Sequence, residues 1–259
     1  DYNPRLGIKG SEWVGFAQFT RFFQSPYFTR ILRNTILLSV YGIAFGFPAP
    51  IILALLLNEL KQKKIKKTVQ TATYLTHFIS LVVVTGIIKE FTQSTGLIND
   101  IIEFFGGTRT SLIQNPALYR TIYITSDIWQ EIGWGSIIYL AALSGIDEQL
   151  YEAASIDGAN RWEKLIHVTL PGISTTIIIM LILRLGQILG SSYEKTILLY
   201  NEATYETADV IASYIYRVGI LERNWSYSTA IGLFNSCINF IFLLVANKLS
   251  KKVSETSLW

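Results

Sequence analysis

Five long apolar stretches constrain the fold of this chain more than any other feature. About 20 helical residues are needed to cross a hydrocarbon core of about 30 Å, and stretches of that kind occupy 35–60, 68–90, 121–144, 172–190 and 227–247. Only helices and closed barrels satisfy all backbone hydrogen bonds inside lipid. We therefore predict an all-α fold, a polytopic helical bundle in a membrane, with residues 1–259 forming a single transmembrane domain.

The composition agrees with a membrane protein and excludes several functions. Hydrophobic residues make up 50% of the chain and charged residues only 16%, whereas a soluble domain has about a quarter charged residues. The formal net charge of +3 is too small to indicate nucleic-acid binding. Cys237 is the only cysteine, which excludes an intrachain disulfide, and we expect it to be a buried, inert thiol.

The lysines predict how the spans are oriented. The connection KQKKIKK, residues 61–67, holds five lysines and should face the cytoplasm. If the spans alternate, residues 145–171 and the C-terminal tail lie on the same side, and the long connections 91–120 and 191–226 lie outside. Pro48 and Pro50 should kink the first span.

The connection 145–171 is amphipathic, and its residues predict a cytoplasmic helix–turn–helix. Residues 150–156 form the first helix, and Asp157-Gly158 reads as a turn because glycine tolerates unusual backbone angles. Residues 159–168 form the second helix, with apolar side chains at helical spacing. We expect Pro171 to end that second helix.

This connection resembles the EAA loop of ABC importer permeases: Glu-Ala-Ala, three residues, Gly, then an apolar run ending in Leu-Pro. The matching positions are Glu152, Ala153, Ala154, Gly158, Ala159, Ile166, Leu170 and Pro171. The wider sequence YLAALSGIDEQLYEAASIDGA is similar to the carbohydrate-importing branch of that family. The resemblance implies the type I ABC importer permease fold, in a multi-pass subunit of a bacterial cytoplasmic membrane.

The resemblance also implies partners and a coupling site. In the family the loop docks into a groove of a cytoplasmic ATPase and transmits its closure. The expected partners are two ATPase subunits, which would bind ATP and Mg, a second homologous permease, identical or different, an extracytoplasmic solute-binding protein and an oligosaccharide. The expected coupling residues are Glu152, Ala153, Ala154, Asp157, Gly158, Ala159, Trp162, Leu170 and Pro171.

The opening DYNPRLGIKGSEWVGFAQFTRFF resembles the segment that follows the first membrane helix in such permeases. We therefore expect a six-span subunit whose first span is missing from residues 1–259.

Polar residues within the spans are candidates for a transport path. One face of the third span carries Tyr123, Asp127, Gln130, Glu131 and Trp134. Carboxylates and amides suit sugar hydroxyls, and aromatic rings suit the apolar faces of pyranoses. The alternative is that this stripe pairs with a second subunit. After the fourth span, the resemblance makes Gln187, Tyr193 and Glu194 secondary candidates, and an ordinary external loop cap is the alternative.

Catalytic and metal-binding motifs are missing from the sequence. It has no glycine-rich phosphate loop ending in Gly-Lys-Ser or Gly-Lys-Thr, and its histidines, His77 and His167, are far apart. We therefore predict a non-catalytic permease subunit that binds no cofactor or metal itself. The alternatives are a permease for another solute such as a peptide, a secondary transporter, for which we find no inverted repeat, and a membrane enzyme acting on lipid-linked glycans.

Overall fold

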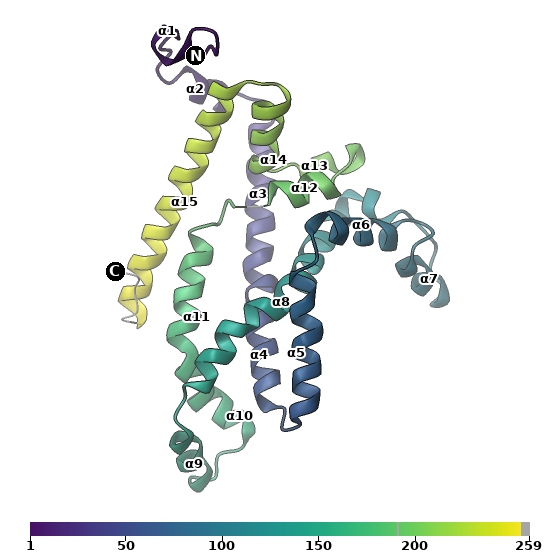
Figure 1. Cartoon of the computed structure of the whole chain (residues 1–259), viewed down its shortest axis with the longest axis vertical. Coiled ribbons are helices and arrows are strands. Elements are labelled where there is room, and N and C mark those ends of the chain that lie inside the picture. Colours follow the sequence, from purple (N-terminus) through teal and green to yellow (C-terminus); the bar gives the residue numbers. More distant parts are fainter. Residues whose placement is uncertain (191, 255–259) are drawn as a thin grey trace. The chain divides into compact units, whose positions relative to one another are not determined.

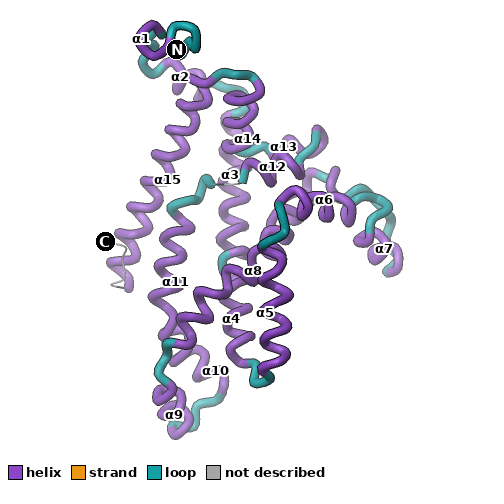
Figure 2. Tube along the Cα trace, viewed as in Figure 1, coloured by secondary structure: helices purple, strands orange, loops and turns teal. Residues whose placement is uncertain are grey.

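The computed structural model describes residues 1–190 and 192–254, and the described residues are helical, with no strand among them (Figures 1 and 2). They form two compact units. Unit 1 comprises α1 (Gly7–Gly10), α2 (Ala17–Phe23), α3 (Phe28–Tyr41), α6 (Leu81–Thr92), α7 (Leu97–Phe104), η2 (Leu112–Gln114), the start of α8 (Pro116–Ser144), α12 (Tyr193–Leu199), η4 (Glu202–Thr204), α13 (Tyr205–Ala208), α14 (Ile211–Tyr216), η5 (Arg217–Leu221) and most of α15 (Trp225–Ser254). Unit 2 comprises η1 (Gly42–Gly46), α4 (Pro48–Glu59), α5 (Lys63–His77), the rest of α8, α9 (Glu148–Ile156), α10 (Arg161–Lys164), η3 (Leu165–Thr169), α11 (Leu170–Leu185) and the end of α15.

Among the described residues, four helical runs are long and apolar enough to cross a membrane: Phe28–Glu59, Leu81–Phe104, Arg161–Leu185 and Trp225–Lys252. The third predicted span lies inside α8, which is 29 residues long. Polar residues make α8 less apolar than these four runs.

The second predicted span, 68–90, is wrong as a single helix. It forms α5 and α6, separated at residues 78–80, where the Ser80 hydroxyl accepts a hydrogen bond from the Val83 amide at 3.4 Å. This serine satisfies one of the free amides that every helix start exposes, so the chain can begin a new helix there. The lysines of 61–67 also differ from expectation, because most of them belong to the first turns of α5 rather than to a loop.

The prediction that Pro171 ends a helix is wrong as well. The helix that starts at Arg161 continues to Leu185 through a π-helical turn, η3, and Pro171 lies in the first turn of α11. Proline lacks an amide and collides with the carbonyl four residues earlier, and a wider turn ahead of it relieves both problems. Pro48 follows the π-helical turn η1 in the same way, at the start of α4.

Each unit has its own packed core. In unit 1, α2, α3, α14 and α15 contribute fully buried apolar residues: Phe22, Ile31, Ile211 and Ile231. In unit 2, α4, α8 and α11 meet around another set: Ile51, Ala54, Tyr139, Leu143 and Ile173. Cys237 on α15 is exposed rather than buried, which corrects the expectation.

Close approach of α5 to α8 in unit 2 depends on Gly133. A Cβ atom built there would lie 2.2 Å from the Thr73 carbonyl oxygen. No real side chain tolerates that distance to backbone, so any larger residue must push the two helices apart.

We predict that Gly133→Ala lowers the thermal stability of the purified chain by the equivalent of about 1–3 kcal/mol, the usual cost of overpacking. The matched control is Gly232→Ala in α15, where an added Cβ meets no atom within 4 Å. Thermal unfolding in detergent, followed by intrinsic tryptophan fluorescence, measures both. Equal midpoints for the two variants would contradict the close packing.

Candidate coupling loop and transport-path residues

The first helix of the predicted coupling loop, α9, has defined ends. The Asp147 side chain caps its start by accepting a hydrogen bond from the Gln149 amide at 2.9 Å. At its end the Ala159 amide donates to Ala154 at 2.9 Å and the Gly158 amide to Ser155 at 3.2 Å. This pair of bonds is a Schellman motif, and it requires the positive φ of +80° that Gly158 adopts. Gly158 therefore ends α9 by backbone geometry.

The second helix starts two residues later with a capping box. The Asn160 side chain accepts hydrogen bonds from the amides of Trp162 and Glu163, at 2.9 and 3.1 Å, and the Glu163 carboxylate accepts one from the Asn160 amide at 2.6 Å. Each bond satisfies a backbone group that the helix start would leave free. The turn between α9 and α10 therefore has a fixed geometry.

Two side-chain contacts hold the halves of the loop together. The Lys164 ammonium donates to the Ser155 hydroxyl at 2.7 Å, and the hydroxyls of Tyr151 and Thr169 hydrogen-bond at 3.0 Å. Glu152 is exposed and makes no side-chain hydrogen bond or ion pair within the part of the chain that the structure describes. Other residues therefore stabilise the loop, and the Glu152 carboxylate faces solvent.

The loop exposes an apolar surface at one end of unit 2, the end that also holds the turn between α4 and α5 (Figure 1). Ile156 is 87% exposed and Trp162 73% exposed, and Leu150 and Ile166 are exposed as well. Ala153, Asp157 and Gly158 are also exposed, whereas Ala154, Ala159 and Leu170 are half-buried. Large apolar side chains gathered on a polar protein surface are typical of a protein interface.

The residues of the predicted polar stripe on α8 have different surroundings. Gln130 is buried in unit 2, and its side-chain amide donates to the Ile79 carbonyl at 3.2 Å. Thr76 donates from its hydroxyl to the Gln130 carbonyl at 3.1 Å. Both bonds hold the break between α5 and α6 against α8. Gln130 therefore has a structural role within the chain.

Glu131 and Trp134 lie beside His77, which the sequence did not connect to them. The Glu131 carboxylate lies 2.9 Å from the Nδ1 atom of His77. The imidazole stacks on the Trp134 ring at 4.5 Å with an interplanar angle of 3°. Glu131 and Trp134 are both exposed, and Asp127 is half-buried. This carboxylate, imidazole and indole offer both hydrogen-bonding groups and an aromatic face to a ligand.

Tyr123 is buried in unit 1 beneath a lysine that sequence reasoning missed. The Lys195 ammonium, itself 1% exposed, lies 4.7 Å from the Tyr123 ring centre and donates to the Tyr123 carbonyl at 3.1 Å. A buried ring covered by a cation presents no face to a sugar, so the structure does not support Tyr123 as a path-lining residue. No local pattern in the sequence indicates this contact, because the two residues are 72 positions apart.

The secondary candidates lie in unit 1, next to Ser191, which is outside the described residues. Gln187 is exposed in the turn after α11. Tyr193 stacks on Tyr216 at 5.6 Å and donates its phenol proton to Glu194 at 3.1 Å. The bond to Glu194 raises the pKa of Tyr193 above its ordinary value. Tyr193 and Glu194 thus form an exposed aromatic and acidic pair.

Sequence analysis also did not identify a buried carboxylate in unit 1. Asp209 is fully buried and binds Arg217 through both carboxylate oxygens, at 3.2 and 2.7 Å, and Arg30 at 3.1 Å. The eight-residue spacing between Asp209 and Arg217 equals about two helical turns, which was a usable signal. Arg30 is 179 positions from Asp209, so only the fold brings these two residues together.

The long apolar helices and the capped helix–turn–helix are consistent with a membrane component of a transport system. Residues 27–255 match the family described as "Binding-protein-dependent transport system inner membrane component". The chain belongs to this family. Its members are transport permeases, which is consistent with a non-enzymatic role for this chain.

Relatives and solved structures of the same kind are similar over nearly the whole chain. The "Polygalacturonan/rhamnogalacturonan transport system permease protein YteP" of Bacillus subtilis is 44% identical over 260 residues, covering 100% of this chain and 81% of the relative. A bacterial alginate ABC transporter, solved in complex with a periplasmic protein carrying an alginate pentasaccharide, contains a chain 45% identical to this one. The TM-score is 0.92, over 95% of this chain and 85% of that one. The MetNI methionine transporter, at 16% identity and a TM-score of 0.62, shares the fold alone.

We predict that Gln130→Leu and Glu131→Gln separate a structural from a functional role. Gln130→Leu leaves the Ile79 carbonyl without its donor and should lower stability by about 1–3 kcal/mol. Glu131→Gln, at an exposed position, should leave the unfolding midpoint unchanged and reduce substrate uptake. Thermal unfolding and uptake into proteoliposomes measure the two effects. Uptake at the wild-type rate in Glu131→Gln would show that Glu131 does not take part in the transport path.

Proposed function

We propose that this chain is a membrane-spanning permease subunit of an ATP-driven importer. With a second homologous permease it forms an alternating-access path for an oligosaccharide, which an extracytoplasmic binding protein delivers. ATP and Mg bind to two separate ATPase subunits, where hydrolysis takes place, and this chain binds no cofactor. The observation that carries the proposal is the capped loop of α9 and α10, with its exposed apolar side chains, within a chain of this permease family.

The loop has the physical properties that transmission of movement requires. A coupling element must move as one body, and the Schellman motif, the capping box and the Lys164–Ser155 bond fix its two helices. It also needs a partner surface, which the exposed Ile156 and Trp162 supply. Because η3 joins α10 to α11 without a break, displacement of the loop passes directly into a membrane helix. The ATPase drives the cycle only if it binds one state of the permease more tightly than the other.

The substrate class rests on the relatives and on the exposed polar and aromatic residues. Two of the relatives with more than 40% identity belong to transport systems for polygalacturonan or rhamnogalacturonan and for alginate. Glu131 with Trp134, and Glu194 with Tyr193, combine acceptors for sugar hydroxyls with aromatic faces. The fold alone does not choose the substrate, because the methionine transporter shares it. Permeation of another solute such as a peptide is the alternative.

We predict that Gly158→Val uncouples the importer. A β-branched residue is strained at a φ of +80°, at a cost of about 1–3 kcal/mol, and the end of α9 should rearrange. ATPase activity of the reconstituted complex, stimulated by saccharide-loaded binding protein, should fall at least fivefold. The control is Gly106→Val, at a φ of +83° in a predicted extracytoplasmic connection, also with no atom near an added Cβ. Equal stimulation in both variants would contradict a coupling role for the loop.

We predict that Trp162→Ala weakens assembly with the ATPase without destabilising the chain. The side chain is 73% exposed, so its removal leaves no cavity. Aromatic anchors at the centre of interfaces often contribute about 2 kcal/mol or more to the binding free energy. The affinity of the detergent-solubilised membrane subunits for the ATPase should fall about tenfold or more. Trp13→Ala, at a position 90% exposed in the predicted extracytoplasmic N-terminal segment, is the matched control. Unchanged affinity would place the ATPase contact elsewhere.

A further inference from the structure

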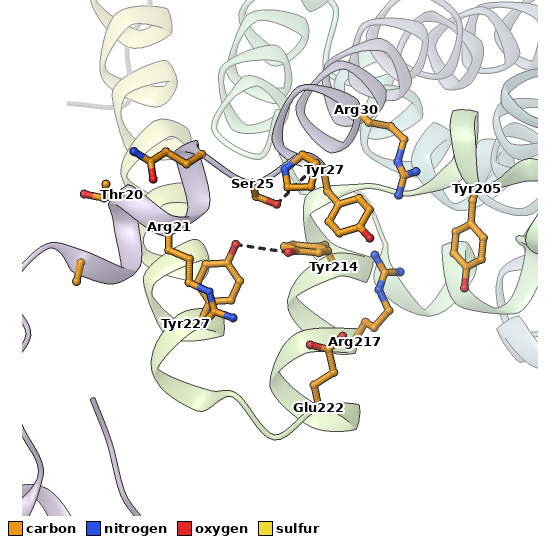
Figure 3. A pocket seen from close by; sticks show the side chains of 13 residues that line it. Thr20, Arg21, Ser25, Tyr27, Arg30, Tyr205, Tyr214, Arg217, Glu222 and Tyr227 are labelled. Atoms are coloured by element: carbon orange, nitrogen blue, oxygen red, sulfur yellow. Dashed lines mark hydrogen bonds between the residues drawn. The ribbon is translucent and has the colours of Figure 1, made fainter.

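Unit 1 contains a large pocket. None of the residues discussed for the transport path lies in its walls. Its volume is about 1240 Å³, and its walls come from α2, the start of α3, α13, α14, η5 and the start of α15 (Figure 3). By the predicted orientation it opens on the extracytoplasmic side, since residues 205–222 belong to an external connection and α3 starts there.

Three arginines line this pocket, and each lies on a tyrosine ring that also lines it (Figure 3). Arg21 is 4.4 Å from the centre of the Tyr227 ring, Arg30 is 5.0 Å from that of Tyr27, and Arg217 is 5.3 Å from that of Tyr214. A guanidinium on an aromatic face is held by cation–π attraction and keeps its edge N–H groups free to donate. The pocket therefore presents oriented cationic donors among aromatic surfaces.

A buried carboxylate holds two of the three arginines in place. Asp209, at 0% exposure, binds Arg30 at 3.1 Å and Arg217 at 2.7 Å, and it also accepts a bond from Ser213 at 2.9 Å. The side chains of Arg30 and Arg217 remain 25% and 22% exposed. Side chains held in this way lose little conformational entropy when a ligand binds.

The charges of the pocket favour an anion. Arg21, Arg30 and Arg217 carry three positive charges, and Asp209 beneath them with Glu222 at the rim carry two negative ones, which leaves one net positive charge. Arg21 is exposed and forms no ion pair within the described part of the chain. The Nε atom of Arg30 is buried and has no hydrogen-bond partner among the described residues. Donor capacity for an incoming carboxylate is therefore present at the exposed Arg21.

We propose that this pocket binds carboxylated sugar rings, as an extracytoplasmic entry site for an acidic oligosaccharide. Guanidinium groups pair with carboxylates through two parallel hydrogen bonds. Arg30 lies over the Tyr27 ring, but Tyr27, unlike the buried Tyr123, is still 45% exposed and offers that exposed ring surface to the apolar face of a pyranose. Neutral sugars are instead held largely by carboxylate and amide acceptors, and this pocket has one of each, Glu222 and Gln24, against three guanidinium groups. The proposal rests on the proposed function and narrows its substrate class.

Ligand-observed NMR titration of the complete transporter complex in lipid nanodiscs, without binding protein, tests this site. The probes are trigalacturonate and its fully methyl-esterified, uncharged form. Wild type should bind trigalacturonate at least tenfold more tightly than the ester, and added NaCl should weaken only the charged probe. Arg21→Gln should weaken trigalacturonate binding about tenfold and leave the ester unchanged. Tyr27→Leu should weaken both.

The matched control is Arg33→Gln, an exposed arginine on α3 that pairs with Glu206 and does not line the pocket. Equal affinity for the two probes, or equal effects of Arg21→Gln and Arg33→Gln, would overturn the proposal. Weaker association of the binding protein with Arg21→Gln, at unchanged trigalacturonate affinity, would also overturn it, because the pocket would then receive a protein.

ATPase stimulation by saccharide-loaded binding protein separates the two proposals. If wild type is stimulated but the pocket binds neither probe, the pocket proposal fails and the importer stands. If trigalacturonate binds as expected but no loaded binding protein stimulates the ATPase, the importer proposal fails.

Discussion

Hydrogen bonding of the backbone at helix breaks is the constraint on which the rest of this structure depends. A membrane offers no water to free amides and carbonyls, so each interruption of a helix needs partners from the protein itself. Between α5 and α6, Ser80 binds an amide and Gln130 binds the Ile79 carbonyl. In the predicted coupling loop, Gly158 and Asn160 do the same for α9 and α10. These few residues decide where the helices end and hence what the loop exposes.

The same constraint explains why two of the π-helical turns, η1 and η3, precede prolines. Pro48 and Pro171 would each leave a carbonyl without its amide partner inside a regular helix. Because η1 and η3 widen the helix just before these residues, the chain continues as helix on both sides. For α10 and α11 the result is mechanical: the loop and the membrane helix form one continuous rod. A helix that stopped at Pro171 would leave a hinge there instead.

Polar groups in this chain fall into two kinds, and burial separates them. Gln130, Lys195 and Asp209 are buried and bound by several protein groups, so they stabilise the fold. Glu131 and Tyr193 are exposed and each has a polar or aromatic neighbour, which suits transient contact with a ligand. Burial thus separates the polar groups that stabilise the fold from those that are accessible to a ligand. Arg30 and Arg217 share features of both kinds, because the buried Asp209 carboxylate orients guanidinium groups that remain partly exposed.

Features that depend on local spacing are encoded in the sequence alone. Apolar stretches of membrane length, the glycine at the end of α9 and the fixed spacing from Glu152 to Pro171 all act within a few helical turns, so they can be read directly from the chain. The tertiary structure decided the partners of the polar residues. Gln130 meets residues 51 positions away, Lys195 meets Tyr123, and Arg30 meets Asp209 across 179 positions. Hydrogen bonds and ion pairs act over a few ångströms of space, and no periodicity in the sequence records which distant segments the fold brings within that range.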